Sequence, residues 1–188
     1  NGNPMTTVTD ADGNYQFVGL GVGTYRVSIV DPNTGVLAGL TNTQAYTGRG
    51  ATQAPVTITD SSVQGVDFGF VKPATIGDRV WNDQDHNGVD NGEPGVPGVT
   101  VILKDASGTE VARTTTDSDG RYRFEGVLPG TYTVSIEVPS GYEAASTSTS
   151  VTLTEGEVNL DIDFPVTLIP TPSQPAKSIL AKTGADAQ

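Results

Sequence analysis

An internal repeat constrains the fold of this 188-residue chain more than any other feature. The segment Thr9–Phe17 reads TDADGNYQF, and Thr116–Phe124 reads TDSDGRYRF. At the same offset, residues 19–29 align with residues 126–136. Shorter matches follow, between residues 56–58 and 151–153 and between residues 66–68 and 162–164. A repeat of this kind predicts consecutive copies of one structural unit, so we expect two copies of one domain.

Each copy alternates apolar and polar residues, which is typical of half-buried β-strands. The alternating apolar positions are Tyr15, Phe17, Tyr25, Val27 and Ile29 in copy one and Tyr122, Phe124, Tyr132, Val134 and Ile136 in copy two. Asp-Gly pairs at 12–13 and 119–120 predict tight turns between strands. We therefore predict an all-β fold of tandem small antiparallel β-sandwiches. The expected boundaries are residues 1–73, residues 74–166, and a Pro-rich linker over residues 167–188.

Copy one lacks a counterpart to the first part of copy two. By the repeat offset, Asn1 falls opposite Gly108, so nothing matches residues 75–103, which hold two expected strands and an acidic loop. A sandwich without two of its strands exposes unpaired edges and an open core. Two readings stay open: copy one is cut from a longer protein, or another chain donates the missing strands.

The acidic loop, Asp83–Glu93, is the strongest candidate binding site. It carries four carboxylates within eleven residues, and its opening Asp-x-Asp-x-Asn-Gly matches the first half of an EF-hand calcium loop. The second half departs from that motif, because Pro94 occupies the twelfth position and the acid comes one residue earlier. No helical pattern flanks the loop, so we predict a Ca²⁺ loop between strands.

The predicted ligands are oxygen donors of the loop: Asp83, Asp85, Asn87, Val89 through its carbonyl, Asp90 and Glu93. A second cation site is predicted from three further acids, Asp78, Asp117 and Asp119. The alternative for both sets is a solvated turn, since Asp, Asn and Gly are ordinary turn residues. Glu93 favours the calcium reading, because glutamate is not a turn former.

The net charge of −12 indicates a chain that repels nucleic acid and attracts divalent cations. There is no cysteine and no apolar run of transmembrane length. The single histidine, His86, has no Ser or Cys partner pattern, so we interpret it as an exposed loop residue and expect no enzymatic activity. Trp81 ends an apolar strand and is expected to fill the core rather than to stack on a sugar.

The C-terminal tail ends in Leu180, Ala181, Lys182, Thr183 and Gly184 behind a Pro-rich stretch. This pentapeptide resembles the sortase recognition motif of Gram-positive surface proteins. The resemblance implies cleavage after Thr183 and attachment of the chain to peptidoglycan, with sortase and peptidoglycan as partners and the bacterial cell wall as the location.

Copy two resembles the B-type repeat domains of Gram-positive serine-aspartate-repeat adhesins, within the collagen-adhesin B-like, prealbumin-like sandwiches. The matching motifs read IGDRVW (76–81), DQDHNG (83–88), GEPGVPGVTV (92–101), TDSDGRYRF (116–124) and PGTYTV (129–134). Family loops usually carry one more residue between Asn-Gly and Gly-Glu. The shorter spacing in this chain displaces Asp90 from its position in the family loop. The resemblance implies calcium-dependent rigid spacers in a cell-surface stalk, with a host protein or self-association as further candidate contacts.

Two other functions remain open. In the first, the chain is a subunit of an extracellular filament, in which a strand of one molecule completes copy one of the next molecule. Alternatively, it is an accessory carbohydrate-binding module of a secreted enzyme, with Trp81, Tyr142 or Tyr46 against the glycan.

Overall fold

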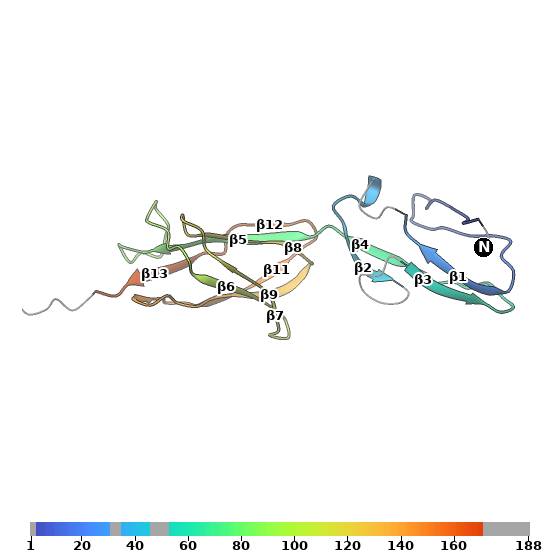
Figure 1. The fold of residues 1–188 in the computed structure, drawn as a ribbon. Helices are drawn as coiled ribbons and strands as arrows, with labels where there is room; N and C mark the ends of the chain where they lie inside the picture. The colour runs from blue at the N-terminus through green and yellow to red at the C-terminus, as the bar shows by residue number, and fades with distance from the viewer. Residues whose placement is uncertain (1–2, 31–34, 46–52, 171–188) are drawn as a thin grey trace, which may run out of the picture. The chain divides into compact units, whose positions relative to one another are not determined.

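The computed structural model describes residues 3–30, 35–45 and 53–170, and it confirms the all-β prediction (Figure 1). The described residues form strands in several small sheets, with a single 3-10 turn, η1 (Gly35–Leu37). Within these residues no helix is both long and apolar enough to span a membrane. The pentapeptide at 180–184, and Tyr46, lie outside the described residues.

Copy one holds two separate antiparallel strand pairs. Strand β1 (Gly23–Ser28) pairs with β3 (Gln53–Ile58), with Tyr25 opposite Val56. Strand β2 (Thr41–Ala45) pairs with β4 (Phe68–Val71), with an irregularity in register between Asn42 and Gln44. Among the described residues of this copy, only Ala54 and Val56 of β3 are buried.

Copy two contains a sheet organised around β5 (Ala74–Asn82). This strand pairs with β8 (Arg121–Val127) and runs parallel to β12 (Val158–Asn159) and to β13 (Phe164–Leu168). Strand β10 (Tyr142–Glu143) extends the sheet by pairing antiparallel with β13. Strand β5 is therefore the element on which three other strands of the sheet depend.

The second sheet of copy two has the order β11 (Ser148–Leu153), β9 (Gly130–Ile136), β6 (Thr100–Asp105) and β7 (Glu110–Thr115). The predicted alternation is clear in β8, where Tyr122 and Phe124 are buried while Arg121 and Arg123 are exposed. Apolar side chains from both sheets form one core. Its fully buried members include Ile76, Val80, Trp81, Val101, Leu103, Val134, Phe164 and Val166.

One strand prediction is wrong. The segment with Tyr15 and Phe17 aligns with β8, but residues 14–20 form no strand, and neither do residues 3–8, which align with β7. The physical reason is the missing partner: in copy two β8 pairs with β5 and β7 pairs with β6, and copy one has no equivalent of β5 or β6. A strand's backbone groups need a neighbouring strand, so alternation alone does not form one.

Candidate calcium site

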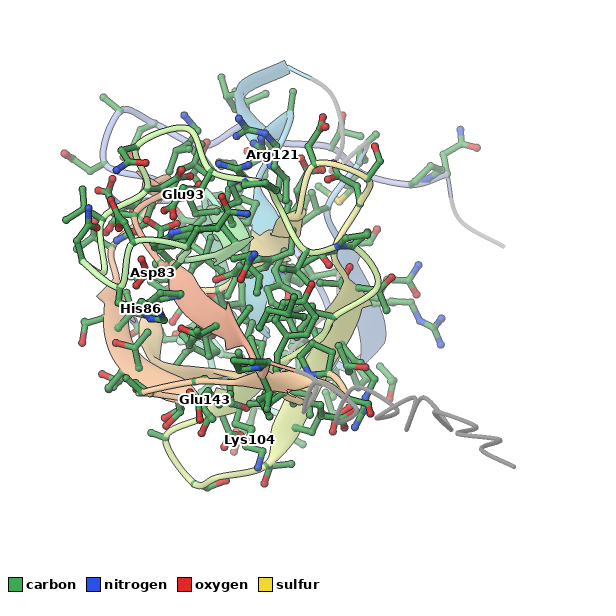
Figure 2. All side chains as sticks on the ribbon, turned by 90° about the vertical axis from the view of Figure 1, so that its left-hand side faces the viewer. Asp83, His86, Glu93, Lys104, Arg121 and Glu143 are labelled. Atoms are coloured by element: carbon green, nitrogen blue, oxygen red, sulfur yellow. The ribbon has the colours of Figure 1, made fainter. Side chains whose placement is uncertain are left out.

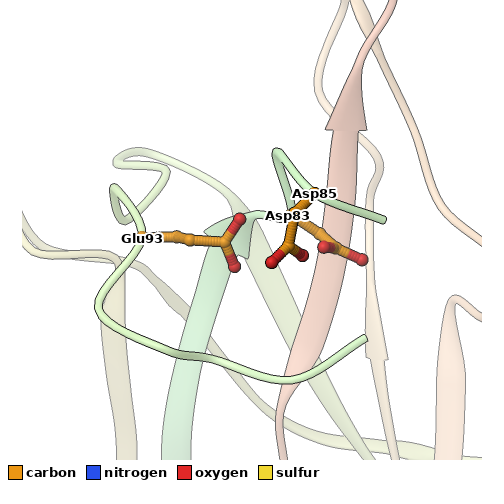
Figure 3. Close-up of side chains that lie close together, drawn as sticks. All are labelled: Asp83, Asp85 and Glu93. Atoms are coloured by element: carbon orange, nitrogen blue, oxygen red, sulfur yellow. The ribbon is translucent and has the colours of Figure 1, made fainter. Parts of the chain in front are cut away.

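The acidic loop leaves the end of β5 and returns to it. Trp81 forms an isolated antiparallel bridge with Gly95, and the amide of Asn82 donates to the carbonyl of Pro94 at 2.9 Å. The amide of Asp83 donates to the carbonyl of Val166 in β13, also at 2.9 Å. The two ends of the loop are thus held together at the edge where β5 and β13 lie side by side (Figure 3).

Behind the loop, the turn before β8 packs against its base without room for side chains. A Cβ on Gly95 would lie 2.0 Å from the carbonyl oxygen of Asp119. Gly120 has a φ of +76° and a Cβ there would lie 2.3 Å from the carbonyl oxygen of Val80. Both positions require glycine, so the loop base and this turn form one closely packed unit.

Three carboxylates converge inside the loop. Each of Asp83, Asp85 and Glu93 offers one oxygen, and these oxygens lie within 4.8 Å of one another (Figure 3). Asp83 and Glu93 are 6% and 8% exposed, whereas Asp85 is exposed. Like charges at this separation repel one another, and burial of two of them increases the cost. A bound cation would remove both penalties.

The Glu93 carboxylate has an oxygen that the protein leaves without a partner. Its Oε1 accepts a hydrogen bond from the amide of Gln84, but its buried Oε2 has none. A buried carboxylate oxygen without a hydrogen-bond partner is costly, and a bound cation would offset that cost. The solvated-turn alternative does not account for this oxygen, since it is turned away from solvent.

The first half of the loop is wrapped around Asp83. Its carboxylate accepts hydrogen bonds from the amides of Asn87 at 3.1 Å and Gly88 at 2.9 Å. Left-handed backbone at His86 (φ 59°) and Gly88 (φ 70°) makes this tight path. Figure 2 shows His86 beside Asp83 in the same loop, where its side chain is exposed. The structure thus confirms the exposed-loop interpretation of His86.

The two neutral ligands predicted for the loop are engaged with each other. The Oδ1 of Asn87 accepts the amide of Val89 at 2.6 Å, and its Nδ2 donates to Asp85 at 2.8 Å. Asn91 donates to the same Asp85 oxygen at 3.0 Å. These contacts keep Asn87 and Val89 next to the three carboxylates, and their roles as ligands stay predictions.

Asp90 faces Arg79 and is outside the group of three carboxylates. The two form an ion pair, and Arg79 also donates to the carbonyls of Glu93 at 2.6 Å and Asp119 at 2.9 Å. Desolvation acts to raise the pKa of Asp90, but the hydrogen bonds from Arg79 and the Gly92 amide, with the positive charge of Arg79, lower it overall. Asp90 therefore braces the loop through Arg79.

The acids predicted for a second site form no group of three among the residues that the structure describes. Asp117 closes the turn before β8, where its Oδ1 accepts the amides of Asp119 and Arg121, both at 2.9 Å. Asp10 makes the same turn in copy one, with the amides of Asp12 and Asn14. This geometry matches the turn alternative for Asp117.

Asp78 meets an acid that the sequence analysis did not single out. It shares a side-chain hydrogen bond with Asp163, directly before β13. Desolvation, that hydrogen bond and the charge of Asp78 raise the pKa of Asp163 to about 7. The repeat offered a sequence clue to Asp163, because this residue aligns with Asp67 of copy one. Its contact with Asp78, however, depends on the parallel pairing of β5 with β13.

Trp81 is 2% exposed, which confirms its place in the core. A buried indole offers no stacking surface, so the glycan-binding role considered for Trp81 is unsupported.

Comparison with known protein families identifies the family that copy two matches. The SdrD B-like domain family matches residues 74–163. Serine-aspartate repeat-containing protein D of Staphylococcus aureus (strain Newman) is 43% identical over 156 residues, which are 79% of this chain and 11% of that protein. The corresponding protein F of Staphylococcus epidermidis is 40% identical over 145 residues, 73% of this chain and 8% of that protein. The chain therefore spans about a tenth of the length of these curated relatives.

Two solved structures align with the chain at low sequence identity. The Bacillus anthracis TIE protein aligns with a TM-score of 0.46 and 19% identity, over 85% of this chain and 28% of that one. GBS52, the minor pilin of Streptococcus agalactiae, aligns with a TM-score of 0.43 and 16% identity, over 90% of this chain and 70% of that one. The family match and the sequence relatives together establish the identity: residues 74–163 are an SdrD B-like domain, in a chain homologous to the staphylococcal Sdr proteins D and F.

Proposed function

We propose that residues 74–166 act as a calcium-stabilised spacer repeat in the stalk of a cell-surface adhesin. The observation that carries this proposal is the convergence of Asp83, Asp85 and Glu93, with the unpaired buried Oε2 of Glu93. Oxygen-only donors on a loop that closes on itself suit Ca²⁺, which accepts six to eight oxygen ligands in flexible geometry. The role of the domain is mechanical, and its partners are the cation and the neighbouring parts of the stalk.

Calcium would stabilise the domain by binding only its folded state. At a free calcium concentration of about a hundred times Kd, this linkage adds about 2.7 kcal/mol to the free energy of unfolding. Extracellular modules of this kind bind with Kd values of about 10⁻⁴ to 10⁻³ M. Calcium-dependent stability of this size is a large fraction of the stability of a small domain.

The position of the loop explains why the cation would stiffen the whole domain. Asp83 is the residue after β5, and its amide already donates to Val166 of β13. A cation held by Asp83 and Glu93 would bind together the end of β5, the returning loop and the turn that packs on Gly95. Strands from the beginning and the end of the domain would then be fixed at one point.

The cell-surface location rests on the Sdr relatives and on the pentapeptide Leu180–Gly184. We propose that sortase cleaves this pentapeptide after Thr183 and joins the chain to peptidoglycan. The spacer would then project a distal binding region away from the wall.

Calcium removal tests the proposal. With EDTA, we expect the melting temperature of copy two to fall by roughly 10 °C or more, because the linkage term is lost. Calorimetry in calcium, in EDTA and after restoration of calcium gives the measurement. Magnesium at equal concentration is the control for general ionic effects. A melt that is unchanged by EDTA would sink the calcium proposal.

A further inference from the structure

The acidic loop contains two Asn-Gly pairs, at residues 87–88 and 91–92, and all four of these residues are exposed. Asparagine is a thermolabile residue, and a following glycine makes it more so, because glycine has no Cβ to keep its backbone nitrogen away from the asparagine side chain. A Cβ built on Gly88 or Gly92 would have no atom within 4 Å, so nothing packs against either glycine. The hydrogen bonds of each pair therefore decide how readily it reacts.

Loss of the side-chain amide from such a pair needs only the chain itself and water. The backbone nitrogen of the glycine attacks Cγ of the asparagine, the new N–Cγ bond closes a five-membered succinimide, and the Cγ–Nδ2 bond breaks. The proton of the glycine amide leaves with the Nδ2 group as ammonia. Water then opens the ring at one of its two carbonyls, which gives aspartate or isoaspartate. Because the nitrogen attacks only after it gives up its proton, a carboxylate that accepts a hydrogen bond from the amide slows the reaction.

The pair Asn87–Gly88 is held at each of its reacting groups. The amide of Gly88 donates to Oδ2 of Asp83 at 2.9 Å, and Asp83 is 6% exposed. The side chain of Asn87 accepts the amide of Val89 at 2.6 Å and donates to Asp85 at 2.8 Å. The carboxylate that protects this pair is therefore buried at the end of β5.

The pair Asn91–Gly92 is held less firmly. The amide of Gly92 donates to Oδ1 of Asp90 at 3.1 Å, and the side chain of Asp90 is 24% exposed. The Nδ2 of Asn91 donates to the exposed Asp85 at 3.0 Å. Asp90 is kept in position by its ion pair with Arg79. Protection of the Gly92 amide thus depends on that ion pair.

We propose that Asn91 is a site of nonenzymatic deamidation, and that the ion pair of Asp90 with Arg79 sets its rate. Asn91 reacts before Asn87, because the amide of its glycine is held by a partly exposed carboxylate and not by a buried one. The ion pair on the loop is in this view a protective contact as well as a structural one.

The reaction changes the loop in two ways. A carboxylate at position 91 replaces the amide that donates to Asp85 with a charge that repels it. Isoaspartate also adds one methylene to the backbone just before Gly92 and Glu93, which shifts Glu93 relative to Asp83. If the loop binds calcium as proposed above, on which only this last step rests, the modified chain binds calcium more weakly, and the change is irreversible.

Incubation of the full chain in mildly alkaline buffer, below its melting temperature, tests the proposal. Trypsin releases residues 80–104 as one peptide, and the fragment ions of this peptide locate the gain in mass at residue 87 or at residue 91. In the parent chain we expect Asn91 to react faster than Asn87. Asp90→Ala should speed the reaction at Asn91 by roughly tenfold, which corresponds to the loss of one hydrogen bond to a charged group. Asn91→Gln should show no gain at residue 91, because attack on glutamine would have to close a six-membered ring.

Asn87 is the internal control, since a substitution that merely loosens or unfolds the loop speeds both sites. Three outcomes would overturn the proposal: equal acceleration at both sites in Asp90→Ala, a rate at Asn91 that Asp90→Ala leaves unchanged, or faster reaction at Asn87 in the parent chain. All rates are measured in calcium and in EDTA, and the order of the two sites should be the same in both.

The effect on calcium binding has its own measurement. Titration calorimetry compares the incubated parent with incubated Asn91→Gln, and we expect weaker calcium binding by the parent. Equal affinities would overturn this last step alone. A chain that binds no calcium before incubation would overturn the calcium function, and the rates at Asn87 and Asn91 would still decide on the modification.

Discussion

At the scale of single residues, the acidic loop separates two roles that its sequence makes look alike. Asp83 is buried next to Glu93 and Asp85, where a cation would be bound, whereas Asp90 is paired with Arg79. Cation binding by Asp83 contributes to stability only when the cation is present. The ion pair of Asp90 with Arg79 contributes whether or not the cation is present, because arginine keeps its charge.

Substitution of Asp83 by Asn should therefore act through calcium. We expect D83N to reduce the free energy of unfolding in calcium by about 1 to 3 kcal/mol, by weakening the calcium linkage. In EDTA its cost should be smaller, because removing one charge relieves the repulsion with Glu93. Denaturant titrations of both proteins, with and without calcium, give the comparison.

Two variants complete that comparison. D90N should lose similar stability in calcium and in EDTA, because it breaks the pair with Arg79. Glu143 is an exposed residue outside the loop (Figure 2). Glu143→Gln should therefore leave the free energy of unfolding unchanged both in calcium and in EDTA. Equal losses for D83N in both buffers would show that Asp83 is only a turn residue.

The Asp78–Asp163 pair should give the domain a pH dependence of a definite sign. Because the pKa of Asp163 is raised to about 7 from an ordinary value of 3.8, the folded state holds a proton that the unfolded state has lost. Stability should thus be highest near pH 4 for this pair and should fall as the pH rises toward 7.

Asp163→Asn removes that dependence. We expect the loss of stability between pH 5 and pH 8 to be smaller in D163N than in the parent, with both measured in EDTA to exclude calcium. A parallel pH profile for the two proteins would count against the shared proton. Asp161→Asn, two residues earlier, is the matched control.

At the scale of elements, the base of the loop depends on close contact between two backbones. Gly95→Ala should destabilise copy two by about 2 to 4 kcal/mol, since its Cβ would overlap the carbonyl of Asp119. Gly21→Ala, with nothing within 4 Å of its Cβ, is the control and should be near neutral. Thermal melts of both variants check the difference, and a neutral Gly95→Ala would contradict the packing described here.

The parts of the fold that depend on local sequence were predictable. The carboxylates Asp83 and Asp85 lie two residues apart in a glycine-containing loop, and the strands of copy two follow the alternation of their side chains. The ion pair of Asp90 was not predictable, because Arg79 comes close only when the loop closes on β5. The strand expected at Tyr15 was wrong for a similar reason, since strand formation depends on a partner elsewhere in the chain.

At the scale of the whole molecule, the two copies should differ in resistance to proteolysis. In copy one, residues 14–20 form no strand and few side chains are buried, so a nonspecific protease should cleave this copy first, even in calcium. Addition of EDTA should then open new sites within residues 83–93. Mass spectrometry of the fragments over time gives the order, and first cleavage within copy two in calcium would contradict this expectation.

The parallel pairing of β5 with β13 has a consequence for a protein under tension. The chain enters copy two at Ala74, the beginning of β5, and leaves it after Leu168, the end of β13. Because the two strands run in the same direction, a pull on these two ends slides one strand along the other. The hydrogen bonds between β5 and β13 are then loaded together in shear, rather than broken one at a time as in a hairpin that is pulled apart from its open end. The acidic loop lies at the end of this pair of strands, so a cation bound there would resist the sliding of β5 along β13.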